Sequence, residues 1–372
     1  MNKKFWAATF TLSGSIIGAG ILGLPYVFSK SGFFVGIAWL IVLGTIVTYI
    51  NLCLGEVTLK TKGNHQVTGY AKKYLGKRGE KIAFISIILG EYSALLAYLI
   101  GEGQSLSKII PGNINPLFLG IAFWFVLTLL LHEGLRGLKK VETYGVMAII
   151  IFILIIFTKF FPQINASNLT TFNSPDILVP MGVVMFALLG FTSIPEMKRE
   201  IKGQEKKLKK AIILGSTIPI TLYILLCTAF VGVAGKNINE IATISFSPII
   251  ILLGIITMFP SYFVKSFSLK DSLKYDKKVS KETNFLLTSI IPLTLYLIVT
   301  IFNYGSFSKV LGVGGIISGG LTGILILIMN KKSKNKRDKK PIYKMKISWT
   351  IIILLSVMFI IGTISEIINY IK

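Results

Sequence analysis

Cysteine, histidine and acidic residues are scarce in this chain of 372 residues. It has two cysteines and two histidines, and its 16 Asp and Glu contrast with 40 Lys and Arg. Cys53 and Cys227 both lie in apolar stretches, where cysteine behaves as a small apolar residue, so the sequence holds no disulfide framework. His65 and His132 have no cysteine or carboxylate at the spacing of metal ligands, and we therefore expect no metal site.

Long polar segments are missing as well. The segments between apolar runs do not exceed about 20 residues, which leaves no room for a soluble catalytic domain. The polar segments contain no Ser/His/Asp set and no carboxylate pair, and the glycines at 18 and 20 lack the preceding strand of a dinucleotide-binding loop. We therefore expect neither an enzyme nor an organic cofactor.

Apolar residues are abundant instead. The chain is 53% hydrophobic and 15% charged, with a mean hydropathy of +0.72, which is typical of an integral membrane protein built from helices. Apolar stretches long enough to cross about 30 Å of hydrocarbon predict eleven spans. These are residues 5–29, 33–58, 82–108, 116–133, 141–160, 177–196, 211–234, 247–269, 284–303, 309–329 and 348–370.

The basic residues are unevenly distributed between these spans. The segments on the same side as the N-terminus hold 33 of the 40 Lys and Arg, the opposite side holds six, and Lys265 lies within a span. This is the positive-inside pattern of a membrane protein, so the net charge of +24 does not indicate nucleic-acid binding. We expect a multi-pass protein of the cytoplasmic membrane with its N-terminus inside and its C-terminus outside.

Two of the spans are interrupted in the same way. The first contains GSIIGAGILGLP over residues 14–25, and the sixth contains ALLGFTSIP over residues 187–195. Small residues followed by a proline allow a membrane helix to unwind, and the freed backbone groups then need a partner other than lipid. Close helix packing also explains a Gly-xxx-Gly spacing, but two such breaks together favour a solute site.

The offset of five spans between the breaks divides the chain into two units. Because five is odd, the second unit enters the membrane from the opposite side, which is the inverted-repeat arrangement of secondary transporters. We predict an all-α membrane fold with a first repeat over residues 1–160 and an inverted repeat over 177–329. Residues 330–372 then add a basic cytoplasmic loop and an eleventh helix.

Two spans carry polar faces inside the membrane. The third span has Glu91, Tyr98, Glu102 and Ser105 within roughly 60° of one another on a helix, and the eighth has Thr257, Ser261, Lys265, Ser268 and Ser272 in one stripe. Ionisable residues within a membrane are costly and are functional candidates by default. Lys265 either lines a cavity, where it could exchange a proton, or extends to the cytoplasmic interface.

Residues 13–25, SGSIIGAGILGLP, resemble the first-helix signature of the amino acid–polyamine–organocation transporter superfamily. Within it, the chain is similar to the amino acid/auxin permeases and the bacterial aromatic amino acid (tryptophan/tyrosine) permeases, through AYLIGEG at 97–103, GFTSIPE at 190–196, and Ser261-Tyr262 with Asp271. The likeness covers nearly the whole chain. It implies a leucine-transporter-type fold that carries an amino acid by alternating access.

The resemblance also implies a substrate site at the two breaks. A half-helix N-terminus attracts anions, so the substrate carboxylate would bind backbone N–H groups there, and backbone carbonyls would accept from the α-ammonium. The implied residues are Gly18, Ala19 and Gly20 for the carboxylate, Ser15, Ile16, Ala187 and Leu188 for the ammonium, and Tyr98, Phe186, Gly190 and Phe191 for the side chain.

The same comparison bears on the substrate and the coupling ion. A pocket bordered by aromatic side chains, with no basic residue expected to face it, suits a neutral side chain, aromatic or branched. Sodium-coupled relatives have a Thr-Ser pair in the eighth helix, where this chain has Pro260-Ser261 and keeps one hydroxyl. We therefore expect coupling to protons or uncoupled exchange, with sodium as the alternative coupling ion. The coupling candidates are Glu91, Glu102, Ser261 and Lys265, and Glu102 could instead receive a cationic side chain.

Two other functions fit the same scaffold. An amino acid sensor, such as a spore germinant-receptor subunit, would bind the ligand without transport being its main role. A channel would pass a solute without saturation. In each case the expected partners are a small molecule and the lipid bilayer, not nucleic acid, and the sequence does not fix the oligomeric state.

Overall fold

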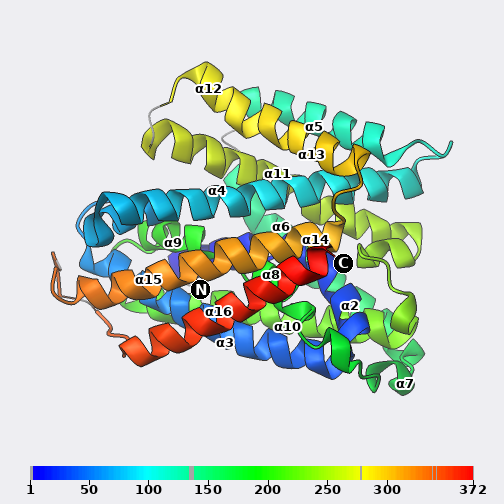
Figure 1. Cartoon of the computed structure of the whole chain (residues 1–372), viewed down its shortest axis with the longest axis horizontal. Coiled ribbons are helices and arrows are strands. Elements are labelled where there is room, and N and C mark those ends of the chain that lie inside the picture. Colours follow the sequence, from blue (N-terminus) through cyan, green and yellow to red (C-terminus); the bar gives the residue numbers. More distant parts are fainter. Residues whose placement is uncertain (1–2, 134–137, 277–278, 337, 341, 372) are drawn as a thin grey trace.

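The structure, a computed structural model, describes residues 3–133, 138–276, 279–336, 338–340 and 342–371, which form helices, turns and loops without a β-strand. Most of the long helices run roughly along the longest axis of the molecule (Figure 1). The main helices are α1 (Lys3–Ile16), α2 (Gly20–Ser31), α3 (Phe33–Lys60), α4 (Val67–Ile109), α5 (Pro116–Glu133), α6 (Leu138–Phe160), α8 (Pro180–Ala187), α9 (Ile194–Glu200), α10 (Leu208–Ala234), α11 (Pro248–Asp276), α13 (Ile291–Ile301), α14 (Phe307–Val313), α15 (Gly320–Ser333) and α16 (Trp349–Ile371). The shorter helices α7 (Ala166–Leu169) and α12 (Lys281–Phe285) lie on connections.

Nine helices of the described chain are long and apolar enough to cross a membrane, and the bent pair α1 and α2 makes a tenth. A shorter apolar helix, Pro116–Leu131, coincides with the predicted fourth span. The all-helical membrane class predicted from the composition is therefore confirmed.

The spans differ in how far the protein itself buries them. In Pro180–Glu200, which contains α8 and α9, 83% of the most apolar 18-residue stretch is buried inside the molecule. The corresponding share in Trp349–Asn369 of α16 is 28%. Leu354 of α16 and Phe118 of α5 are about two-thirds exposed, at 65% and 64%. The sixth predicted span thus lies at the centre of the bundle, while α5 and α16 present apolar side chains outward, as lipid-facing helices do.

The first predicted span is broken into two helices. α1 ends at Ile16, residues 17–19 are not helical, α2 begins at Gly20, and the two helices are bent by 53°. Pro25 lies inside α2, so the unwound stretch precedes the proline instead of adjoining it. A Cβ on Gly18 would lie 2.6 Å from Tyr98 Oη, and one on Gly20 would lie 2.5 Å from Ala187 Cα. Close approach to neighbouring chain segments therefore requires glycine at both positions.

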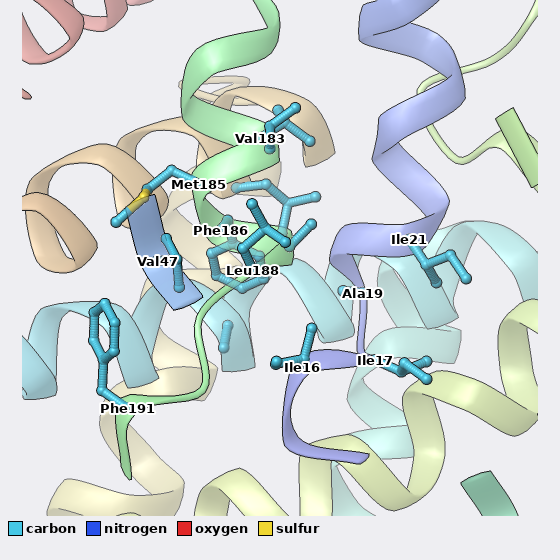
Figure 2. Packing of buried hydrophobic residues seen from close by; sticks show 14 of the residues in the cluster. Ile16, Ile17, Ala19, Ile21, Val47, Val183, Met185, Phe186, Leu188 and Phe191 are labelled. Atoms are coloured by element: carbon cyan, nitrogen blue, oxygen red, sulfur yellow. The ribbon is translucent and has the colours of Figure 1, made fainter. Parts of the chain in front are cut away.

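The sixth predicted span is broken as well. α8 ends at Ala187, residues 188–190 are not helical, and a 3₁₀ turn over Phe191–Ser193 leads into α9. Pro195 lies in the first turn of α9, where its missing N–H costs nothing. The unwound segments of the two spans lie opposite each other, with Ile16 and Ala19 on one and Leu188 on the other (Figure 2).

The third span is longer than its apolar pattern predicts. The apolar run covers residues 82–108, but α4 runs over Val67–Ile109 and bends at Gly76, whose φ is 78°. The first fifteen residues of α4 are rich in lysine, so a criterion based on apolar residues misses them. The predicted loop before the third span is therefore partly helical.

Candidate functional site

A cavity of about 600 Å³, counting its open mouth, lies where the two breaks meet. Of the residues implied for substrate binding, eight line it, namely Ser15, Ile16, Gly18, Gly20, Tyr98, Phe186, Gly190 and Phe191. The other three, Ala19, Ala187 and Leu188, are buried in the adjoining hydrophobic core. Segments about 170 residues apart in the sequence therefore form one site.

Tyr98 of α4 closes one side of the first break. Its hydroxyl lies against Gly18, where an added Cβ would lie 2.6 Å from Tyr98 Oη and 3.9 Å from Ser261 Oγ. Ser261 Oγ donates to the Thr257 carbonyl at 2.8 Å, so this serine is held within α11. The phenol thus contacts the backbone that the sequence predicts to bind a carboxylate.

Tyr223 of α10 closes the opposite side of both breaks, and sequence reasoning missed it. Its hydroxyl lies 2.8 Å from the Ile16 carbonyl and 2.9 Å from the Ala187 carbonyl. These two carbonyls were among those predicted to receive a substrate ammonium. In this structure the phenol contacts both carbonyls. Of the four residues predicted for the ammonium, Ser15 and Ile16 line the cavity, and the Ile16 carbonyl is the one of these two that Tyr223 contacts.

Glu91 of α4 and Lys265 of α11 face each other across the cavity. Lys265 Nζ lies 3.5 Å from Glu91 Oε1, and the side chains are 20% and 5% exposed, respectively. Glu91 Oε2 has no hydrogen-bond partner among the described residues. Both side chains line the same cavity as the breaks, so the pair belongs to the site.

This arrangement corrects one expectation about the pocket. The sequence predicted that no basic residue faces it, but Lys265 does. Of the two alternatives for Lys265, the structure shows the one in which it lines a cavity, with its ammonium paired to Glu91. The stripe on α11 is turned toward α4, which sequence periodicity could not establish. The pair as a whole carries no net charge, so the pocket still offers no unpaired cation to an acidic side chain.

A second cavity, of about 410 Å³ with its open volume, continues from the first. The two cavities share Ile87, Glu91 and Thr192 in their walls. Ser268 and Ser272 of the α11 stripe line the second cavity, as do Gln66 and Thr68 at the start of α4. Polar groups therefore connect the breaks with the segment before α4, which we predict to be cytoplasmic.

Glu102 does not join these cavities. Its side chain is fully buried, and neither carboxylate oxygen has a hydrogen-bond partner among the residues that the structure describes. Ser105 Oγ, one turn further along α4, is likewise buried without such a partner. The polar face of the third span is thus divided, with Glu91 and Tyr98 at the cavity and the other two residues beyond it.

A wall of the cavity from the tenth predicted span was also missed. A π-helical turn over Gly314–Gly319 leads into α15, and Ser318, Gly319 and Thr322 line the cavity. Ser86 of α4 holds this wall, since its hydroxyl donates to the Ser318 carbonyl at 2.9 Å. The sequence GVGGIISGG over residues 312–320 is as rich in glycine as the first break and could have signalled this turn.

Comparisons with known proteins show which family the chain belongs to. Residues 1–366 match the tryptophan/tyrosine permease family. The chain is similar to the tyrosine-specific transport system 1 of Haemophilus influenzae, with 25% identity over 239 residues, or 64% of this chain and 60% of that protein. It is also similar to glutamine transporter 2 of Aliivibrio fischeri, with 24% identity over 254 residues, or 66% of this chain and 64% of the relative. The chain is also similar to the low affinity tryptophan permease of Escherichia coli, with 25% identity over 242 residues, or 61% of this chain and 58% of the relative.

These alignments span less than two-thirds of the length of the relatives, while the family match covers nearly all of this chain. The relatives are named as transporters of amino acids, not as enzymes. The matched region includes both helix breaks and the pair of Glu91 and Lys265. The chain belongs to the tryptophan/tyrosine permease family.

Proposed function

We propose that this chain is a secondary transporter that carries a neutral amino acid across the cytoplasmic membrane by alternating access. The observation that carries the proposal is the meeting of two helix breaks at one cavity. Unwound backbone inside a membrane bundle is tolerated where it lines a cavity, and it supplies N–H and C=O groups to a solute there. Membership of a permease family supports the same function.

The proposed scaffold has eleven spans in two inverted five-span repeats. Nine spanning helices, the bent pair α1 and α2, and the short apolar helix Pro116–Leu131 together support this count. The breaks in the first and sixth predicted spans support the repeat. The N-terminus would then lie inside and the C-terminus outside, in agreement with the distribution of lysine and arginine.

In the proposed complex, the backbone of the first break holds the common part of the amino acid. The N–H groups of Gly18 and Gly20, whose residues line the cavity, would bind the carboxylate together with the Tyr98 hydroxyl. The ammonium would bind at Ser15, next to the C-terminal end of α1, where the helix dipole favours a cation. Phe186 and Phe191 would then surround the side chain.

The pair of Glu91 and Lys265 is the proposed site of proton coupling. Glu91 has one carboxylate oxygen paired with Lys265 and one without a partner in the described chain. A proton that binds the second oxygen would neutralise the carboxylate and release Lys265 from the ion pair, which couples protonation to the charges at the cavity. The second cavity has Glu91 in its wall together with Ser268 and Ser272, and so places polar groups between this pair and the predicted cytoplasmic side. Glu102 is a second candidate, because an ionised carboxylate without a partner is costly inside a membrane.

Reconstitution in liposomes tests this function. A thermal-shift screen with the twenty amino acids first identifies the ligand, which stabilises the protein by about 2.7 kcal/mol at a hundred times its Kd. Uptake of that ligand is then measured with an inward proton gradient, with an inward sodium gradient, and with unlabelled amino acid inside. Saturable uptake driven by protons or by exchange is the expected result.

The alternatives give different outcomes in the same experiment. Binding without uptake would identify a sensor, and uptake that does not saturate would identify a channel. Uptake that requires sodium and ignores the proton gradient would overturn the proposed coupling.

A further inference from the structure

The last carbonyls of two broken helices converge on one phenol. α1 ends at Ile16 and α8 ends at Ala187, so both carbonyls lie at helix ends, where backbone acceptors lack partners within the helix. Tyr223 Oη lies 2.8 Å from one and 2.9 Å from the other. Tyr223 is fully buried, and Ala187 belongs to the hydrophobic core next to the cavity. The phenol therefore joins the breaks from behind the site.

The helix that carries Tyr223 is shaped to hold α1. Gly215, Pro219 and Tyr223 follow one another at intervals of four residues, so they lie on one face of α10. Pro219 has no N–H, and the Gly215 carbonyl is therefore left without its usual helical donor. Ser13 of α1 donates its hydroxyl to this carbonyl at 3.0 Å.

Close approach of the two helices depends on the same face. A Cβ at Gly215 would lie 2.9 Å from the Thr9 carbonyl oxygen and 3.0 Å from Leu12 Cβ. Glycine thus allows α1 to lie against α10, the proline frees a carbonyl for Ser13, and Tyr223 reaches the end of α1 two turns further along. The face of α10 thus contacts α1 at Gly215 and again at Tyr223.

Tyr223 on this face also reaches α8. A phenol has one proton and the two carbonyls are both acceptors, so the hydroxyl satisfies them only while both stay within about 3 Å of it. The distance between the ends of α1 and α8 is thereby limited. Those ends continue directly into residues 17–20 and 188–190, which carry the backbone of the proposed site.

We infer that Tyr223 is a positioning residue, which fixes the two unwound segments relative to each other and so sets the geometry of the substrate site without touching the substrate. The inference rests on the proposed function, because it assigns the substrate to these segments.

The matched test compares Tyr223→Phe with Tyr296→Phe. Tyr296 of α13 is also buried, and its hydroxyl also donates to a backbone carbonyl, that of Pro116, at 3.1 Å, but away from the breaks. Both variants keep the aromatic ring and lose one phenol hydroxyl that lies within hydrogen-bond distance of two backbone carbonyls, since Tyr296 Oη also lies 3.4 Å from the Leu117 carbonyl. We expect Tyr223→Phe to weaken amino acid binding about tenfold or more, and Tyr296→Phe to leave it within about twofold.

Hydrogen exchange provides a readout that needs no ligand. In Tyr223→Phe, peptides that cover residues 17–20 and those that cover 188–190 should both exchange about tenfold faster than in the unsubstituted protein, while Tyr296→Phe leaves them unchanged. If Tyr223→Phe fails to fold, the unsubstituted protein still tests the inference, because a bound amino acid should slow exchange in both segments together. Protection of one segment alone would then overturn it.

Two failures remain distinguishable. If the unsubstituted protein binds no amino acid, the proposed function fails, while the exchange measurement still tests the link between the breaks. If it binds an amino acid and Tyr223→Phe matches Tyr296→Phe in both affinity and exchange, the inference about Tyr223 is wrong.

Discussion

The Lys265 ammonium lies 3.5 Å from the Glu91 carboxylate, so that α11 and α4 contribute opposite charges to the wall of one cavity. Both side chains are largely buried. Burying either charge alone inside the bundle would cost free energy, because the other charge would no longer compensate it. The pair therefore makes the cavity polar while leaving it electrically neutral.

Removing only one member of this pair should be costly. Lys265→Met leaves the Glu91 carboxylate without a counter-charge, and we expect a loss of about 3 kcal/mol in the free energy of unfolding. Glu91→Gln should cost less, because Lys265 is the more exposed member. The double variant Glu91→Gln/Lys265→Met should recover part of the loss, as measured by a double-mutant cycle. Strict additivity would contradict a direct interaction.

The transport behaviour of Glu91→Gln tests the coupling separately. This variant should still exchange amino acids across liposomes but should no longer respond to a proton gradient, because Gln cannot carry the proton. Glu282→Gln, at the first turn of α12, removes an exposed carboxylate and serves as the control. A proton-driven uptake that survives Glu91→Gln would move the coupling to another group, with Glu102 next to be tested.

Gly20→Val should abolish amino acid binding. The added Cβ would lie 2.5 Å from Ala187 Cα, and main chain cannot yield as a flexible side chain can, so the two breaks must separate. The thermal shift with amino acid should vanish while the protein still accumulates in the membrane. Gly145→Val in α6 is the control, since no atom lies within 4 Å of a Cβ there. A retained thermal shift in Gly20→Val would place the substrate elsewhere.

Gly18→Ala and Tyr98→Phe should compensate for each other sterically. An alanine Cβ at position 18 would lie 2.6 Å from Tyr98 Oη but 3.7 Å from Tyr98 Cζ, an ordinary contact. Gly18→Ala alone should therefore cost about 1–3 kcal/mol of stability, and less than half of that in the Tyr98→Phe background. Chemical unfolding of the four proteins measures both costs. Equal costs in the two backgrounds would show that the hydroxyl is not in the way.

Asp338 should secure the loop that follows α3 in a pH-dependent manner. Its carboxylate accepts from the Lys73 ammonium and, at 2.8 Å, from the Lys62 N–H, and these contacts hold the pKa of Asp338 below its usual value of 3.8. The stabilisation is therefore complete above pH 3.8 and is lost as the pH falls through the lowered pKa.

At neutral pH, Asp338→Asn should consequently raise the hydrogen-exchange rate of residues 60–64 a few-fold over that of the unsubstituted protein. The difference should shrink in acid, once the native carboxylate is protonated. If the difference in exchange rate persists unchanged below the lowered pKa, the Asp338 side chain secures the loop by packing and not through its negative charge.

The positions of the breaks could be predicted from the sequence because they depend on local chemistry. Glycine at 18 and 20 and the glycine at 190 weaken a helix wherever they occur in a membrane span. Their partners could not be predicted in the same way. Tyr223 lies in an apolar run of α10 like other buried tyrosines, and only the packing of α1 and α8 brings two carbonyls to its hydroxyl.

The direction of the polar stripe on α11 also needed the structure. Its spacing places Ser261, Lys265 and Ser268 on one face of a helix, but spacing says nothing of the rotation of that helix toward lipid, protein or cavity. Packing against α4 turns Lys265 to Glu91, and so the expected absence of a basic residue from the pocket was wrong. The coupling ion and the substrate stay predictions for the same reason, since both depend on groups that converge only in the folded bundle.

Because Gly20 and Ala187 contact each other through the backbone, one part of the proposed site is built from main chain and another part from side chains. At the main-chain part, the substrate is recognised by peptide groups, which every residue possesses. A substitution there can block binding sterically but cannot change which chemical groups are recognised. The part of the wall that Phe186 and Phe191 form is built from side chains and can be reshaped one residue at a time. A lineage of such proteins could therefore exchange one amino acid substrate for another while the grip on the shared amino and carboxyl groups stayed the same.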